Sequence, residues 1–245
     1  MDSAINKAPS FTTDSNISTP ENNTTVGTTI SASDENVTNG AISLSSSNDK
    51  ISANIALSTN SITIEFWGSF NNLTNQQNLI NIKEAPSGDA FIPFKAANNQ
   101  IAFYLHDGSS GTPYVSDFVI SDTDEYHHYV FIYNGDNQTV SIFVDGKATS
   151  VNNISSIAIV GTDVNTTTIG SDLNGLFDSN VTYNDIRIWD DVRTPSEINA
   201  TMNTELNGNE DGLVAYYKLN ETSGTNIIDS SLNGYNGVLN GTTLP

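Results

Sequence analysis

The sequence contains no cysteine among its 245 residues, so it can form neither disulfide bonds nor thiolate zinc sites. Basic residues are also scarce, because 8 Lys and Arg stand against 28 Asp and Glu, and the formal net charge is −20. A surface this acidic repels phosphate backbones and anionic lipids, which argues against nucleic-acid and membrane-surface partners. It attracts divalent cations, although acidity of this kind also serves simply to keep a protein soluble.

Long apolar runs are missing as well. No segment approaches the roughly 20 residues that a membrane-spanning helix needs. The start of the chain, Met1-Asp2-Ser3, lacks the basic and apolar regions of a secretion signal. We therefore expect no membrane insertion, and if the protein is exported we expect this sequence to be a segment of something larger.

Short alternating segments rich in Asn, Ser and Thr are present instead, and the clearest covers residues 125–147. Its first half alternates aromatic and aliphatic residues in the order Tyr129, Val130, Phe131, Ile132, Tyr133. This pattern predicts a strand that is covered on both faces. An Asn-Gly-Asp-Asn turn at 134–137 and an Asp-Gly turn at 145–146 predict a hairpin with a second reversal at its far end.

Further segments follow in a fixed order on either side of this hairpin. They lie at residues 40–51, 61–67, 166–170, 184–190, 212–219 and 229–239. Together with the His-His pair before the hairpin strand and the Val-Asp-Gly after it, they resemble laminin-G-like and pentraxin-like domains of the concanavalin A-like lectin superfamily. The resemblance covers residues 39–245 and implies an all-β fold, an antiparallel jelly-roll β-sandwich with one short helix.

The helix is also indicated by its local residues. Thr194 is a good N-cap, Pro195 suits the first helical position, and Glu197 completes a capping box. We predict a helix over residues 195–202.

Residues 1–38 differ from the remainder. Their Pro-x-Phe and Pro-Glu-Asn motifs resemble the opening strands of a cadherin-like repeat, but the other strands of such a repeat do not follow. We predict that residues 1–38 are an N-terminal linker or a partial cadherin-like pair of strands, ahead of a laminin-G-like domain at 39–245.

Catalysis is not indicated. Glycoside hydrolases need two suitably spaced carboxylates, and the sequence has no ExDxxE run that would supply them on a strand. The three His residues do not show the spacing of a zinc site. We expect His127, His128 and Trp67 to be buried framework residues, and we predict that the protein is not an enzyme.

A metal site is better supported, because Asp and Asn in loops supply the oxygen ligands that calcium prefers. The resemblance to pentraxin-like domains places such a site at Asn78, Asp172, Asn174 and Asp178. A second possibility is Asn48 and Asp49 with Asp229 and Asn233. In both cases the same residues are also common turn formers.

A glycan would need aromatic faces and polar groups on the sheet or at its rim. The candidate ligand-binding residues are Tyr104, His106, Asp107 and Tyr114, with an ordinary loop as the alternative for residues 106–111.

The resemblance implies a non-catalytic extracellular binding module, with calcium as cofactor, that serves carbohydrate binding or cell adhesion within a large modular surface protein. The expected location is secreted or at the cell surface. The expected partners are a glycan or another cell-surface ligand and other domains of the same polypeptide. A structural spacer in an adhesin and an accessory domain of a polysaccharide-degrading enzyme remain as alternatives.

Overall fold

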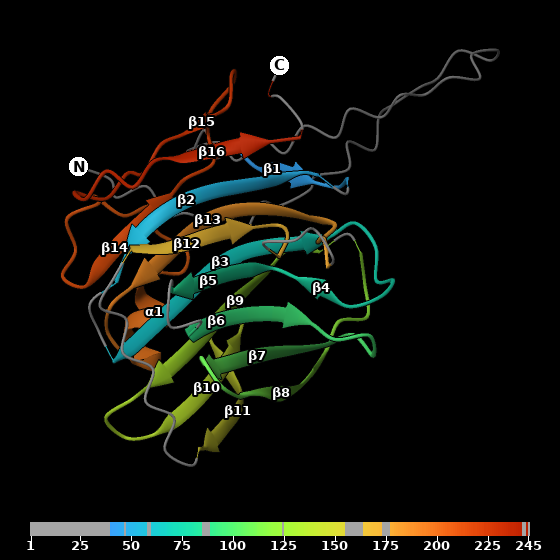
Figure 1. The fold of residues 1–245 in the computed structure, drawn as a ribbon, viewed down its shortest axis with the longest axis vertical. Helices are drawn as coiled ribbons and strands as arrows, with labels where there is room; N and C mark the ends of the chain where they lie inside the picture. The colour runs from blue at the N-terminus through green and yellow to red at the C-terminus, as the bar shows by residue number, and fades with distance from the viewer. Residues whose placement is uncertain are drawn as a thin grey trace.

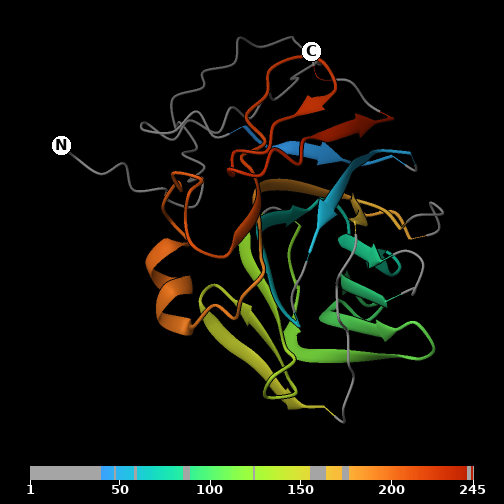
Figure 2. The same cartoon turned by 60° about the vertical axis from the view of Figure 1, so that its left-hand side comes forward.

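The computed structural model describes residues 40–46, 48–57, 60–84, 89–123, 125–154, 164–172, 177–241 and 244. These residues form two antiparallel β-sheets that face each other as a sandwich (Figures 1 and 2). The predicted all-β jelly-roll sandwich is therefore confirmed. The predicted segment at 1–38, including its cadherin-like strands, lies outside the described residues.

One sheet has seven strands in the order β1-β13-β3-β9-β10-β11, with β14 also paired to β13. Its strands are β1 Ile42–Leu44, β3 Ser61–Phe70, β9 His127–Asn134, β10 Thr139–Val144, β11 Lys147–Asn153, β13 Val181–Trp189 and β14 Leu213–Tyr217. We call it the seven-stranded sheet.

The other sheet has nine strands in the order β15-β16-β2-β12-β5-β6-β7-β8, with β4 also paired to β6. Its strands are β2 Lys50–Ala56, β4 Gln77–Asn78, β5 Ile80–Glu84, β6 Asp89–Lys95, β7 Gln100–Asp107, β8 Gly111–Val119, β12 Val164–Ile169, β15 Asn226–Ile227 and β16 Gly237–Asn240. Because β16 pairs with β2, the described C-terminal strands belong to the same sandwich as the first ones.

The predicted hairpin is formed by β9 and β10, which pair from Tyr129 opposite Val144 to Asn134 opposite Thr139. At the far end, the two-residue reversal to β11 places Asp145 at φ 52° and Gly146 at φ 72°. Positive φ at both central residues is what such a turn requires, and Asp and Gly tolerate it. The second turn is therefore confirmed as well.

The two faces of β9 pack against different layers, as the alternation predicts. Its aromatic residues lie in the main core between the sheets, where Phe131 stacks on Phe66 at a centroid distance of 6.2 Å. Its aliphatic residues lie on the outer face of the seven-stranded sheet, beneath the helix α1 (Pro195–Thr201), in a cluster of Val130, Ile132, Phe143 and Ile198. Figure 2 shows α1 (orange) on this outer side.

The helix begins as predicted and ends one residue earlier, at Thr201. The Thr194 hydroxyl accepts a hydrogen bond from the Glu197 N–H, and the Glu197 carboxylate accepts one from the Thr194 N–H. This reciprocal capping box satisfies two backbone donors that a helix start otherwise leaves unpaired. Within the described residues, no helix is long and apolar enough to cross a membrane.

Candidate functional site

The outer face of the nine-stranded sheet carries a pocket of about 420 Å³, which we call the sheet pocket. The pocket results from the alternation of side chains along two strands. On β5, Ile80 and Ile82 point into the core, so Asn81 between them faces outward. On β7, Phe103 and Leu105 point into the core, so Tyr104 faces outward. The described residues that line it are Gln76, Asn78, Asn81, Ile92, Phe94, Tyr104, Pro113, Asp172 and Phe177. The pocket thus combines aromatic rings with amide groups and one carboxylate.

A glycine in the neighbouring strand sets the position of the Tyr104 ring. Tyr104 lies opposite Pro113 in the β7–β8 pair, two residues from Gly111. A Cβ atom on Gly111 would lie 1.9 Å from the Tyr104 hydroxyl oxygen, which is closer than any real contact. The ring can therefore lie across β8 only because residue 111 has no side chain.

A second hollow of about 550 Å³ adjoins the sheet pocket, and we call it the rim pocket. Gln76 and Phe177 line both hollows, and the Phe177 side chain is 42% exposed. Asp178 lines the rim pocket, where its Oδ1 accepts a hydrogen bond of 2.7 Å from the Ser171 hydroxyl. The two hollows share Gln76 and Phe177, so the Phe177 ring lies where the more polar rim pocket meets the more apolar sheet pocket.

The rim is held in place by a buried cation, the Lys95 ammonium group. Its Nζ donates to the backbone oxygens of Leu73, Asn75 and Ala96 at 2.6–3.2 Å and to Asn99 Oδ1 at 3.1 Å. Burial lowers the pKa of Lys95 from its usual 10.5. Gln77 adds a second tie, because its Oε1 accepts a hydrogen bond from the Asn180 N–H at 2.8 Å. Loops from three parts of the chain are thereby joined at the rim.

The structure brings two of the four predicted metal ligands to the sheet pocket. Asn78 and Asp172 line it and are 6% and 9% exposed, while Asp178 lies in the adjoining rim pocket. Asn174 lies outside the described residues. Asn78, Asp172 and Asp178 supply the hard oxygen atoms that calcium takes, and the backbone oxygens and water would have to complete its usual six to eight ligands.

The structure places the four predicted glycan-binding residues in different surroundings, although the Tyr104 and His106 rings have centroids 6.1 Å apart. Tyr104 lines the sheet pocket, but Tyr114 lies opposite Phe103 and packs against the main core. Asp107 closes its own loop, since its Oδ1 accepts hydrogen bonds from the Ser110 and Ser109 N–H groups, which lower its pKa to about 2. His106 Nδ1 accepts from the Gly108 N–H at 3.0 Å. The 106–111 segment thus has the geometry of a hairpin connection.

The alternative calcium position is occupied by turn hydrogen bonds. Asp49 Oδ2 accepts from the N–H groups of Ser45 and Ser46 at 3.2 and 3.0 Å. The Asp229 carboxylate accepts from the N–H groups of Tyr216, Ser231 and Tyr235 and from the Ser231 hydroxyl. Asn233 donates to the backbone oxygens of Leu213 and Val214. These side chains therefore stabilise turns and strand ends through hydrogen bonds to the backbone.

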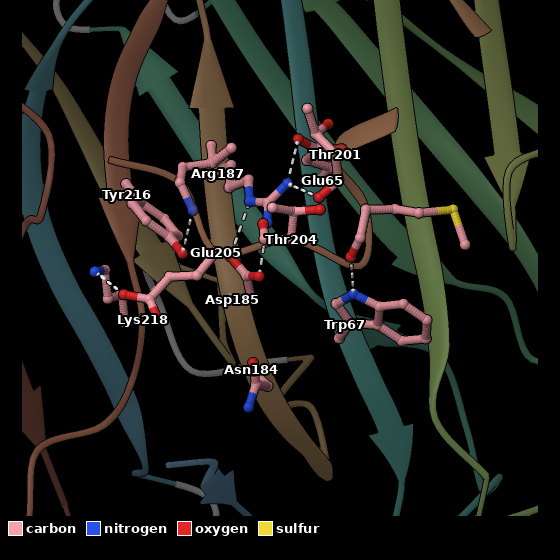
Figure 3. Close-up of polar contacts among 12 residues, drawn as sticks. Glu65, Trp67, Asn184, Asp185, Arg187, Thr201, Thr204, Glu205, Tyr216 and Lys218 are labelled. Atoms are coloured by element: carbon pink, nitrogen blue, oxygen red, sulfur yellow. Dashed lines mark hydrogen bonds and ion pairs between the residues drawn. The ribbon is translucent and has the colours of Figure 1, made fainter. Parts of the chain in front are cut away.

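The outer face of the seven-stranded sheet holds a buried charged network (Figure 3). The Arg187 guanidinium is 1% exposed, donates two hydrogen bonds of 2.8 and 2.7 Å to the Asp185 carboxylate, and lies 3.5 Å from Glu65 Oε1. It also donates to the backbone oxygens of Thr201 and Thr204. The network therefore anchors the end of α1 and the segment after it to the sheet.

Glu65 is fully enclosed in the same network. Burial by itself raises the pKa of its carboxyl group, but His128, Arg187 and the Trp189 indole together outweigh this effect and lower the pKa to about 2. Trp189 Nε1 donates to Glu65 Oε1 at 2.9 Å, and His128 Nε2 lies 3.3 Å from Glu65 Oε2. None of these residues lines the sheet pocket or the rim pocket.

Trp67 and His128 are buried, as expected, but on this outer face and not between the sheets. The Trp67 indole donates to the Met202 backbone oxygen at 2.8 Å and packs on His128 at a centroid distance of 5.2 Å. Phe66, the preceding residue, occupies the inter-sheet core. Phe66 and Trp67 are successive residues of one strand, so their side chains point to opposite faces of the sheet.

Sequence reasoning did not identify several residues of the two pockets, among them Gln76, Asn81 and Phe177. Phe177 carried a usable signal, because it is an aromatic residue next to Asp178, in the very loop that was proposed to bind calcium. Asn81 is a polar residue flanked by core isoleucines, which marks an outward position on a strand.

The two facing sheets, with an open pocket on one outer face, define a jelly-roll β-sandwich domain of the lectin type. A laminin G family described as the concanavalin A-like lectin/glucanases superfamily matches residues 11–199, and the chain belongs to this family. The match begins ahead of residue 39, where we expected the domain to start. No curated protein matches the sequence.

Several solved structures share the fold. A Bacteroides ovatus protein with a proposed role in carbohydrate binding is 19% identical, with a TM-score of 0.64 over 84% of this chain and 60% of its own length. The carbohydrate-binding module of a Ruminococcus gnavus sialidase, bound to α2,3-sialyllactose, is 12% identical, with a TM-score of 0.52 over 66% of this chain and 95% of that module. Domains LG4-5 of the mouse laminin α1 chain are 12% identical, with a TM-score of 0.51 over 61% and 41% of the two chains.

Proposed function

We propose that this domain is a non-catalytic carbohydrate-binding module that holds a glycan in the sheet pocket, with a calcium ion at the rim. The observation that carries the proposal is the lining of the sheet pocket, in which the rings of Tyr104 and Phe177 lie among the polar side chains of Asn78, Asn81 and Asp172. Aromatic faces stack on the CH groups of sugars, while amides and carboxylates bind hydroxyl groups. The volume of about 420 Å³ falls within the usual range for small-molecule sites.

The absence of catalysis is part of the proposal. Among the described residues that line the sheet pocket, Asp172 alone carries a carboxylate, whereas glycoside hydrolysis requires a pair. The bound sialyllactose of the Ruminococcus gnavus module and the proposed role of the Bacteroides ovatus protein support carbohydrate as the ligand class. We further propose that the domain works outside the cell, secreted or at the cell surface, as part of a larger modular protein such as an adhesin.

Calcium is proposed from the chemistry of the rim. Asp172, Asp178 and Asn78 present carboxylate and amide oxygens close to the sheet pocket, and Asn174 belongs to the same loop in the sequence. An ion held there would hold Asp172 and Asp178 in place, and with Asp178 its neighbour Phe177 beside the sugar. A ligand that binds only the folded state raises its stability by about 2.7 kcal/mol at a concentration of 100 times its Kd.

A glycan array run with calcium and with a chelator tests both parts of the proposal. We expect binding to at least one glycan in calcium, loss of that binding on Tyr104→Ala, and loss of the calcium-induced rise in Tm on Asp172→Asn combined with Asp178→Asn. Asp117→Asn, an exposed carboxylate on β8, is the matched control and should change neither result. Absence of glycan binding in both conditions would contradict the carbohydrate proposal and favour a structural spacer. Glycan binding that persists in chelator would contradict only the calcium part.

A further inference from the structure

A second group of polar side chains lies away from both pockets, where the 120–126 loop enters β9. Asp122 and Glu125 belong to this loop, and His127 is the first residue of the strand. Each offers one ligand atom, a carboxylate oxygen or a ring nitrogen, and these atoms all lie within 4.8 Å of one another. Residues of this kind at this separation are able to share one cation.

The His127 ring is oriented by a carboxylate on its other side. Its Nδ1 lies 2.7 Å from Asp145 Oδ2, and Asp145 Oδ1 accepts a hydrogen bond from the His128 N–H at 3.0 Å. Asp145 is itself held in the tight turn between β10 and β11. When Nδ1 donates its proton to Asp145, the lone pair of Nε2 faces Asp122, whose Oδ2 is 3.7 Å away. A carboxylate behind the imidazole is the usual arrangement of a metal-binding histidine.

Three buried polar atoms at this place have no hydrogen-bond partner: His127 Nε2, Asp122 Oδ1 and the Tyr129 hydroxyl. Tyr129 is fully buried, lies on the same face of β9 as His127, and has its ring centroid 6.0 Å from the imidazole. A buried polar group without a partner lowers stability, and a bound ion with its water would supply the missing partners.

The ligand set indicates which metal fits. Calcium takes oxygen ligands, whereas zinc and similar first-row ions accept imidazole nitrogen together with carboxylate oxygen. Two ligands on a tetrahedral zinc ion lie about 3.4 Å apart, close to the 3.7 Å between His127 Nε2 and Asp122 Oδ2. Glu125 is exposed and can rotate inward to complete the set.

We propose that Asp122, Glu125 and His127 form a binding site for a divalent transition-metal ion of the zinc type, with Asp145 orienting the imidazole from behind. Three protein ligands leave at least one coordination position for water or for an oxygen of a partner molecule. The ion would join the 120–126 loop to β9 and, through Asp145, to the turn that ends β10. This site is independent of the proposed glycan and calcium sites.

Isothermal titration of the full chain with Zn²⁺ at neutral pH tests the site, with Co²⁺ absorption as a second readout of nitrogen and oxygen ligation. We expect one Zn²⁺ per chain. Glu125→Gln changes an exposed side chain and leaves the fold intact, and His127→Gln removes the nitrogen ligand; both should weaken binding by more than tenfold. Asp145→Asn should weaken it by about 10- to 100-fold, the usual cost of losing such an orienting carboxylate.

Asp117→Asn serves as the control for general attraction of cations to this acidic surface and should leave Zn²⁺ affinity unchanged. Circular dichroism confirms that each variant is folded before titration. Failure of the unmodified chain to bind Zn²⁺ would overturn the proposal. The cluster would then be an ion pair of protonated His127 with Asp145 and Asp122. Binding that survives both Glu125→Gln and His127→Gln would equally overturn it, because the ion would then lie elsewhere.

Discussion

The two outer faces of this sandwich both carry polar side chains on strands, yet they present them differently. On the seven-stranded sheet, Arg187, Asp185 and Glu65 are at most 3% exposed and lie beneath α1 and the segment that follows it. On the nine-stranded sheet, Tyr104 of β7 lines a hollow open to solvent, together with Asp172 from the loop after β12. Polar groups that are enclosed and paired serve stability, whereas polar groups that line an open hollow remain accessible to a ligand.

The largest expected effect is on the closed face, from Arg187→Met. Removing the guanidinium leaves Asp185 and Glu65 as buried carboxylates without their cation and frees the backbone oxygens of Thr201 and Thr204. Loss of one partner of a buried ion pair costs about 3–5 kcal/mol. Urea denaturation should show a destabilisation of this size.

The matched change on the open face is Phe177→Ala. Because Phe177 is 42% exposed, its removal should change the free energy of unfolding by no more than about 0.5 kcal/mol. If Arg187→Met and Phe177→Ala had the same free energy of unfolding, the buried network would not stabilise the fold. The two outer faces would then not differ in their contribution to stability.

The second expected effect is a loss of stability at low pH, and it arises from Glu65 in the buried network of the seven-stranded sheet. The pKa of Glu65 falls from 4.5 to about 2 on folding, so the folded state gains stability above pH 4.5 and loses it as the pH falls toward 2. A shift of this size corresponds to about 3 kcal/mol. Denaturation measured between pH 6 and pH 2 should show the loss, and Glu65→Gln should be less stable at pH 6 but show a flatter pH dependence. An equal slope in both proteins would assign acid sensitivity to other carboxylates.

A small effect on stability is also expected on the open face, from Gly111→Ala. The new Cβ would meet the end of the Tyr104 side chain, which can swing outward, so we expect a stability loss below about 1 kcal/mol. Glycan affinity should fall nonetheless, because the ring leaves the sheet pocket. Affinity measured on a glycan identified by array gives the readout, with Asp117→Asn, an exposed change on the same strand β8, as the control. Unchanged affinity would show that the Tyr104 ring does not contact the ligand.

Several elements could be predicted because their signals are local. The β9–β10 hairpin follows from alternation and two turn sequences, and α1 follows from Thr194, Pro195 and Glu197 within four positions. The site was predicted only in part. Asn78 and Asp172, which the sequence predicts as calcium ligands, both line the sheet pocket, and their role as ligands stays a prediction. Tyr114 was grouped with Tyr104 although the two point to opposite sides of the sheet. The structure therefore keeps Tyr104 in the candidate site and separates Tyr114 from it.

By itself, then, the sequence determined the strands, their two-faced alternation, the turns and the helix cap, because each depends on residues within a few positions of one another. Only the tertiary structure decided which of these residues meet. Asn78 and Tyr104 come from β4 and β7, which both pair with β6. Asp172 lies in the loop after β12, and it reaches the same pocket only because β12 pairs with β5, a strand distant in the chain. The same holds for His127 and Asp145, which strand pairing joins across 18 residues. Such contacts depend on register between strands, and no local pattern specifies it.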